Sequence, residues 1–131
     1  MPDHALSGRR PIVFFDGGCP LCRREISHYR RLDKAGRVDW QDIHADAAPL
    51  KAWRIDWDAA MRRMHVVDAR GQIHSGAWAF VVVWRHLPYY RLLGRVLSRV
   101  PPVVRLMDRV YNGIARRRWR SRCGDGLCRP D

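Results

Sequence analysis

A short apolar run at residues 11–15, Pro-Ile-Val-Phe-Phe, leads directly into the segment Asp-Gly-Gly-Cys-Pro-Leu-Cys at residues 16–22. Aromatic and β-branched residues that end at Asp-Gly-Gly predict a short buried strand followed by a turn. Two cysteines, Cys19 and Cys22, then stand three residues apart. This junction constrains the fold most, because a CxxC pair beside a β-α-β unit is typical of a redox site.

The residues that follow have the spacing of an amphipathic helix. Apolar side chains recur at steps of four, three and three, and Arg, Ser and His fill most of the other positions. We expect this helix to cover residues 19–35 and to end at Gly36, since glycine is favoured just after a helix. Residues 38–44 then resume as a strand, which completes a β-α-β unit. The apolar stripe consists of Cys22, Ile26, Tyr29 and Leu32.

The remainder of the chain is predicted to hold a hairpin and several helices. Gly71 can supply the positive φ that a tight turn needs between residues 64–68 and 72–75. Pro88 and the Pro101-Pro102 pair are expected to interrupt the helical segments that follow. The predicted helices are a turn or short helix near Pro49, then residues 56–63, 77–86, 90–100 and 103–114, with an Arg-rich tail from Arg116.

The order strand, helix, strand, helix, hairpin and helices predicts an α/β fold with a mixed sheet covered by helices. A chain of 131 residues is long enough for one ordinary core. We therefore expect a single domain at residues 11–119, an N-terminal tail at 1–10 and a Cys-containing basic tail at 120–131. In such sheets, reactive groups gather beyond the carboxyl ends of the strands, where Cys19 is expected to lie.

The two cysteines differ in their positions on the predicted helix. Cys19 stands in the first turn, where free backbone N–H groups and the helix dipole favour a thiolate. Cys22 begins the apolar stripe one turn later, so we expect it to be the less exposed thiol. In the mechanism that follows, Cys19 attacks a disulfide and Cys22 resolves the mixed disulfide. This chemistry requires no bound organic cofactor, and its direction depends on the reduction potential.

The segment Asp-Gly-Gly-Cys-Pro-Leu-Cys, preceded by an apolar strand, resembles the motif of the DCC family of thiol-disulfide oxidoreductases, which is named for its Asp and two Cys. Residues 64–80 are similar to the family's hairpin and following helix, and residues 111–118 to its basic C-terminal end. The likeness covers residues 12–119. It implies a thioredoxin-like fold with additional C-terminal helices, and exchange with a disulfide- or dithiol-bearing protein or a small thiol. The catalytic candidates are Cys19, Cys22 and Asp16.

Two positions depart from the pattern of thioredoxins. Thioredoxins carry a proline at the start of the strand that faces the CxxC, whereas no proline occurs here between Pro49 and Pro88. Gly18 stands where thioredoxins have the Trp that precedes the first Cys, so we expect a more open Cys19. Substrate recognition is therefore expected to differ.

Asp16 and a second cysteine pair have several open roles. Asp16 is either a proton relay for Cys22 or a residue that satisfies backbone donors at the helix start. Cys123 and Cys128 flank Gly-Asp-Gly-Leu in the C-terminal tail. Four interpretations stay open for them: electron exchange with Cys19, protection of that site, metal binding, and incidental thiols of a chain terminus.

The alternative function is a non-catalytic binding module in which the CxxC is structural and a basic helical surface docks an acidic partner or a membrane. A structural zinc site needs four ligands, of which the CxxC supplies two. None of the remaining candidates has a zinc-finger spacing, and a redox role is the preferred interpretation. The candidate completions are His28, His44, His65, His74, Cys123 and Cys128.

The formal charge of +12 is concentrated in the last third of the chain. Residues 1–84 have 13 Lys and Arg against 10 Asp and Glu, and residues 85–131 have 12 Arg against three Asp. Such a patch attracts phosphates, anionic lipids or acidic proteins without choosing among them, so peripheral contact with an anionic membrane stays open. Nucleic acid is not expected as a partner, because the six Trp suit core packing and no RNP, KH or zinc-knuckle pattern occurs.

The chain is expected to be cytoplasmic. Its longest apolar run, residues 77–84, is far shorter than the roughly 20 residues of a membrane-spanning helix. The first fifteen residues lack the apolar region of a secretory signal. Four cysteines without such a signal indicate a reducing compartment. The oligomeric state is left open.

Overall fold

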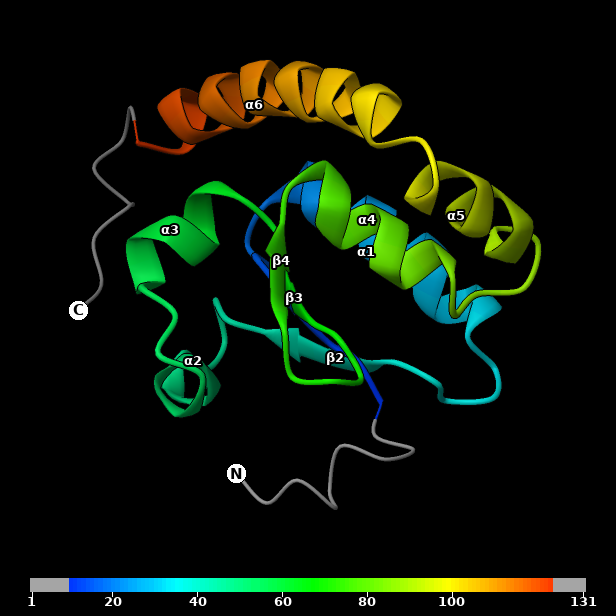
Figure 1. The fold of residues 1–131 in the computed structure, drawn as a ribbon. Helices are drawn as coiled ribbons and strands as arrows, with labels where there is room; N and C mark the ends of the chain where they lie inside the picture. The colour runs from blue at the N-terminus through cyan, green and yellow to red at the C-terminus, as the bar shows by residue number, and fades with distance from the viewer. Residues whose placement is uncertain (1–9, 124–131) are drawn as a thin grey trace.

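The computed structural model describes residues 10–123. In this part of the chain the sheet consists of β1 (Ile12–Phe15), β2 (Asp39–Asp42), β3 (His65–Val67) and β4 (Ile73–Ser75), in the order β2-β1-β3-β4. β1 pairs in parallel with β2, whereas β1 with β3 and β3 with β4 are antiparallel. The predicted α/β fold with a mixed sheet is therefore confirmed (Figure 1).

Helix α1 (Pro20–Leu32) connects β1 to β2 and ends earlier than the predicted residue 35. The carboxylate of Asp33 accepts hydrogen bonds from the backbone N–H groups of Arg37 (2.8 Å) and Val38 (3.0 Å). Gly36 does adopt a positive φ of 64°, but it lies in the turn after the helix. The helix stops at Leu32 because the Asp33 side chain offers the following backbone amides an alternative to helical hydrogen bonds.

The two faces of the sheet carry separate apolar clusters, because successive side chains of β1 point to opposite faces. Val13 and Phe15 pack with buried residues of α1 and of α4 (Ala77–Trp84). Phe14 packs on the other face with buried residues of α2 (Ala48–Ala52) and α3 (Trp57–Arg62). Helices thus cover both faces of the sheet (Figure 1).

The predicted hairpin and C-terminal helices are also present. Gly71 has a φ of 86° at the turn between β3 and β4. After α4 come α5 (Arg91–Ser98) and α6 (Pro101–Cys123). Pro101 and Pro102 occupy the first turn of α6, where a missing N–H is tolerated. The helix continues past Arg116, where a tail was predicted to begin.

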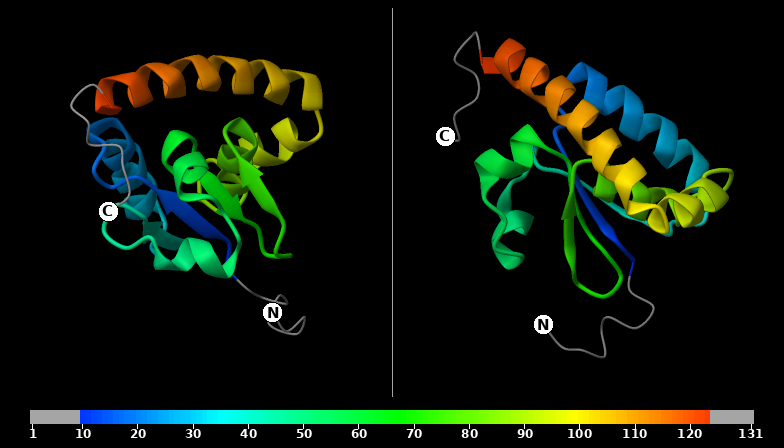
Figure 2. Two further views of the ribbon diagram at one scale, coloured as in Figure 1. Left: turned by 90° about the vertical axis from the view of Figure 1, so that its left-hand side faces the viewer. Right: turned by 45° about the horizontal axis from the view of Figure 1, so that its top comes forward.

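Helix α6 lies over α4 and beside α1 (Figure 2). Polar contacts hold it there: the carboxylate of Asp108 accepts the backbone N–H of Ala77 (3.1 Å) at the start of α4 and pairs with Arg63. The hydroxyl of Tyr111 accepts the backbone N–H of Met64 (2.7 Å), just before β3. These bonds bring the C-terminal helix close to the sheet edge that carries the dithiol. Within residues 10–123, no helix combines the length and the apolar character needed to cross a membrane.

Candidate active site: the dithiol and its pocket

Cys19 and Cys22 lie together at the end of β1, as the sequence predicts. Cys19 is the N-cap residue of α1, with extended backbone angles (φ −90°, ψ 120°), and Pro20 is the first helical residue. The backbone N–H of Cys22 donates a hydrogen bond to the Cys19 Sγ atom (3.4 Å). Both thiols are free. A helix amide therefore points at the Cys19 sulfur, as its place at the helix start predicts.

The order of exposure of the two thiols is the reverse of the prediction. Cys19 is only 2% exposed, whereas Cys22 is half-buried and lines a pocket. The Cys19 side chain folds back over the first turn as its cap, while Cys22, one turn later, faces the space beside α6. The absence of a side chain at Gly18 does not open Cys19 to solvent, so that expectation was wrong as well.

Cys22 is a poor acid in this environment. Burial raises the pKa of the Cys22 thiol to about 12, the guanidinium of Arg118 acts in the opposite direction, and contacts with Cys19 and Asp16 raise it further. At neutral pH the Cys22 sulfur therefore carries its proton in the reduced protein.

Asp16 is a buried carboxylate, 3% exposed, beside the dithiol. Its Oδ1 atom accepts the backbone N–H of Gly18 (3.0 Å), and its Oδ2 atom lies 3.4 Å from Nη1 of Arg118. The N-cap residue of the helix is Cys19, and the backbone donor that Asp16 Oδ1 satisfies belongs to Gly18, in the loop just before it. The Asp16 charge also raises the pKa of the Cys22 thiol. A role of Asp16 as proton relay for Cys22 remains a prediction.

Arg118 is the site residue that sequence reasoning missed. Besides Asp16, its guanidinium donates hydrogen bonds to the carbonyl oxygens of Met61 and Arg62 at the C-terminal end of α3. A cation suits this position, since the last carbonyls of a helix lack intrahelical partners. The basic segment at residues 111–118 resembled the family, but no local pattern indicated that Arg118 would meet a residue 102 positions away.

Asp42, at the end of β2, holds the loop before the cysteines. Its Oδ1 atom accepts the backbone N–H groups of Gly17 (2.8 Å) and His44 (2.9 Å). A Cβ atom at Gly17 would lie 1.9 Å from Asp42 Oδ2, so only glycine fits there. The loop that positions Cys19 is thus fastened to the neighbouring strand.

A pocket of about 580 Å³ lies between α1, α4 and α6, with Cys22 in its wall. Most of its lining is apolar, and Asp16, Glu25 and Arg118 are the charged residues among those that line it. Met64, just before β3, also lines it. The other apolar lining residues are Phe15, Leu21, Ile26, Ala60, Ala77, Phe80, Trp84, Leu106, Met107, Val110, Tyr111, Ile114 and Ala115.

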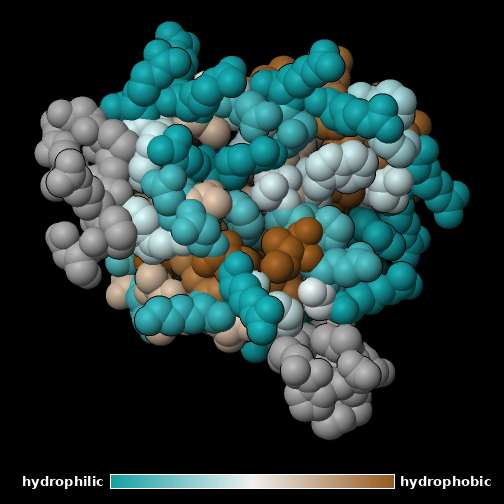
Figure 3. Space-filling view, turned by 60° about the vertical axis from the view of Figure 1, so that its left-hand side comes forward, coloured by the Kyte–Doolittle hydropathy of each residue, from teal (hydrophilic) through white to brown (hydrophobic). Residues whose placement is uncertain are grey.

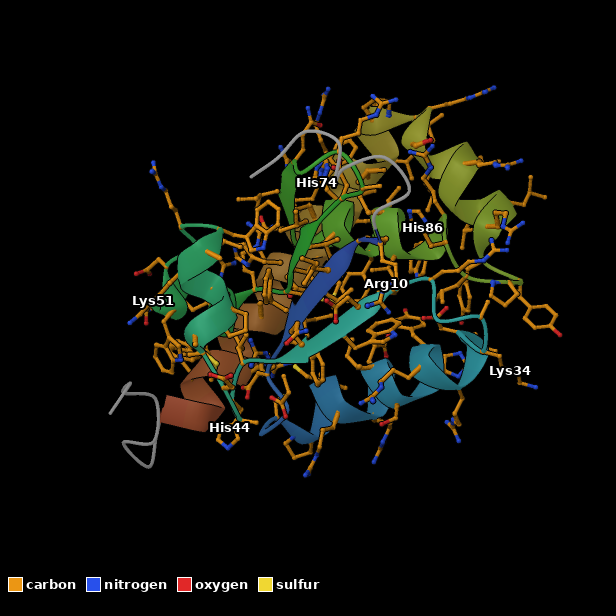
Figure 4. The ribbon with its side chains drawn as sticks, turned by 90° about the horizontal axis from the view of Figure 1, so that it is seen from below. Arg10, Lys34, His44, Lys51, His74 and His86 are labelled. Atoms are coloured by element: carbon orange, nitrogen blue, oxygen red, sulfur yellow. The ribbon has the colours of Figure 1, made fainter. Side chains whose placement is uncertain are left out.

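Within the described side chains, the dithiol and the four suggested histidines do not form a group that could hold a metal ion. His44 Nδ1 lies 3.9 Å from Asp16 Oδ1, whereas His74 lies far from His44 and pairs with Asp68 (Figure 4). Among the described side chains, no three His, Cys, Asp or Glu residues are grouped so that they could hold a metal ion. The side chain of Cys123 and all of Cys128 lie outside the described residues, so the roles suggested for them stay predictions.

The fold and the site define a class: a thioredoxin-like α/β protein whose CxxC pair caps the helix after the first strand. Residues 13–123 match the DCC1-like thiol-disulfide oxidoreductase family, and the chain belongs to this family. The resemblance noted from the sequence motif is thereby confirmed. No curated protein and no solved structure matches the chain significantly.

Proposed function

We propose that the protein is a thiol-disulfide oxidoreductase that exchanges the Cys19–Cys22 dithiol or disulfide with a disulfide- or dithiol-bearing partner. The observation that carries this proposal is the hydrogen bond from the Cys22 N–H to the Cys19 sulfur. It brings the two residues into contact and directs a helix amide at one sulfur. Membership of the DCC1-like family supports the same chemistry.

The exchange needs no other reactant. One protein thiolate attacks the partner disulfide and forms a mixed disulfide, and one partner sulfur leaves as a thiolate and takes a proton. The second protein sulfur then attacks the first, closes the Cys19–Cys22 disulfide and releases the other partner thiol. Two electrons and two protons pass to the partner, and the reverse reaction oxidises a partner dithiol. Asp16 is the proposed proton relay for Cys22.

The test compares disulfide reduction by the wild-type protein with that of Cys19→Ser and Cys22→Ser. Both variants should lose more than about 90% of steady-state turnover, because each retains one sulfur and cannot close the intramolecular disulfide. Cys123→Ser is the matched control and should retain activity, because the proposed steps use only Cys19 and Cys22. Equal turnover by the wild type and Cys19→Ser would rule out the proposed chemistry.

A second candidate function is docking onto an acidic protein or an anionic membrane. On α5, Leu92 and Val96 are 72% and 52% exposed, and Arg91 and Arg95 belong to the same helix. The face shown in Figure 3 is mostly hydrophilic, with hydrophobic side chains gathered in patches between the polar ones. Co-sedimentation with phosphatidylglycerol vesicles at low salt tests membrane docking, and no binding there would remove that form of the alternative.

A further inference from the structure

The pocket beside the dithiol has a long apolar wall, and its charged lining residues are Arg118, Asp16 and Glu25. Leu106, Val110, Ile114 and Arg118 are spaced four residues apart, so they form one row along α6 and all line the pocket. The row is about 18 Å long, from the helical rise of about 1.5 Å per residue. Its apolar part leads toward Arg118, which stands next to Cys22 and Asp16.

The apolar part of this row lacks a partner within residues 10–120, whose side chains are described. Leu106, Val110 and Ile114 are 62%, 59% and 51% exposed, and Leu21 on α1 is 51% exposed. The floor beneath them includes Phe80 and Trp84 of α4. A pocket of about 580 Å³ suits a small molecule, and these walls suit a hydrocarbon chain.

Cys22 is the sulfur that a molecule in the pocket meets. It lines the pocket, whereas Cys19 does not and is 2% exposed. In disulfide exchange the attacking sulfur approaches along the S–S axis, from the side opposite the leaving sulfur. From the pocket, Cys22 is therefore the sulfur attacked and Cys19 the one that leaves. The Cys22 amide and the start of α1 are placed to accept the charge of that leaving thiolate.

We propose that this pocket binds a dithiol carried on a hydrocarbon chain, with its sulfur end at Cys22 and Arg118 and its chain along the apolar row of α6. The inference rests on the proposed exchange function and adds the substrate class and the order of attack. Arg118 is the cation among the lining residues and attracts the attacking thiolate, against the opposing charges of Asp16, with which it is paired, and Glu25. This order is the reverse of the one expected from the sequence.

The reaction balances without a further reactant. A substrate thiolate attacks Cys22 Sγ in the oxidised protein, the Cys19–Cys22 bond breaks, and its electron pair leaves on Cys19 Sγ, which takes a proton from the substrate. The second substrate thiolate attacks the first substrate sulfur, closes the substrate disulfide and expels Cys22 as a thiolate, which takes a proton. Two electrons and two protons pass from substrate to protein.

The first test uses methyl and octyl methanethiosulfonate, which differ only in the chain that they attach to a thiol. In Cys19→Ser, Cys22 should react at least about tenfold faster with the octyl reagent than with the methyl reagent, relative to free cysteine, because the pocket binds the chain. Peptide mass mapping separates this reaction from those of the tail cysteines. Cys22→Ser is the matched control, and its Cys19 should show no such preference. No chain-length preference at Cys22, or an equal one at Cys19, would overturn the inference.

The second test measures oxidation of dihydrolipoamide and of dithiothreitol by the oxidised full-length protein. Leu106→Gln and Val110→Gln should each raise the KM for dihydrolipoamide about tenfold and that for dithiothreitol much less, because dithiothreitol has no long chain to lie along the row. Leu92→Gln and Val96→Gln, at similarly exposed positions of α5 outside the pocket lining, should alter neither. Oxidation of neither substrate by the wild type would defeat the proposed function. Two results would defeat only this inference. In the first, the pocket variants oxidise dithiothreitol normally and keep an unchanged KM for dihydrolipoamide. In the second, the pocket substitutions change self-association or vesicle binding instead of the KM.

Discussion

At the scale of single residues, Gly17 shows how closely the loop before the dithiol is packed. Its backbone N–H donates to Asp42, and the space where a side chain would begin is filled by the same carboxylate. The Asp-Gly-Gly sequence predicts a turn, yet the need for glycine at residue 17 comes from a strand neighbour 25 residues away. Backbone conformation alone therefore does not explain why glycine is needed at residue 17.

Gly17→Ala should lower the free energy of unfolding by about 1–3 kcal/mol, because the added methyl group must displace the Asp42 carboxylate from its hydrogen bonds. Urea denaturation measures this change. Gly113→Ala is the matched control: nothing lies within 4 Å of its added methyl group, so helix propensity should raise the stability by about 1 kcal/mol. Equal stability of Gly17→Ala and the wild type would mean that Asp42 moves aside freely.

At the scale of elements, α6 is fixed by contacts that its amphipathic pattern does not reveal. Asp108 provides a side-chain acceptor at the start of α4, whose own N-cap, Gly76, has no side chain to do so. Gly76 has a φ of 65°, and a Cβ there would meet the Arg63 and Asp108 side chains. A tertiary contact thus replaces a local helix cap.

Asp108→Ala should therefore cost about 1–2 kcal/mol of stability, since it removes both the acceptor for the Ala77 N–H and the partner of Arg63. Asp58→Ala removes an exposed ion pair with Arg62, in which the side chains are 52% and 55% exposed, and should cost well under about 1 kcal/mol. Chemical denaturation of both variants gives the comparison. A loss for Asp108→Ala no larger than that for Asp58→Ala would contradict the proposed capping role.

At the scale of the whole molecule, partly buried histidines link stability to pH. Burial lowers the pKa of both His65 and His86 below their ordinary 6.5, and the nearby Arg85 and Arg37 lower that of His86 further. The folded state therefore binds protons less readily than the unfolded state. This contribution to stability is present above pH 6.5 and is lost as the pH falls through the lower pKa values of the folded state.

The free energy of unfolding should accordingly fall between pH 7 and pH 5, measured with urea under reducing conditions. His86→Gln should flatten this dependence, because it removes one group that the folded state holds neutral. If the free energy of unfolding of His86→Gln falls as steeply with pH as that of the wild type, His86 does not contribute to the pH dependence.

The residues by themselves determined the elements and the location of the dithiol. Apolar alternation and periodicity are local properties, so β1, α1, the hairpin, α4 and α5 were predictable to within a few residues, whereas α6 continues to Cys123, past the predicted end at residue 114. The Asp16 to Cys22 motif likewise identified the site. Helix ends were less predictable where a side chain such as that of Asp33 competes with the backbone.

Only the tertiary structure decided which thiol faces the outside and what surrounds it. Local periodicity assigned the more buried position to Cys22, but burial depends on what packs against a helix, and α6 leaves a pocket at Cys22, whereas the capping Cys19 is buried. The pairing of Arg118 with Asp16 depends on the same packing. Contacts between residues a hundred positions apart follow from how layers assemble, for which a single sequence carries no local signal.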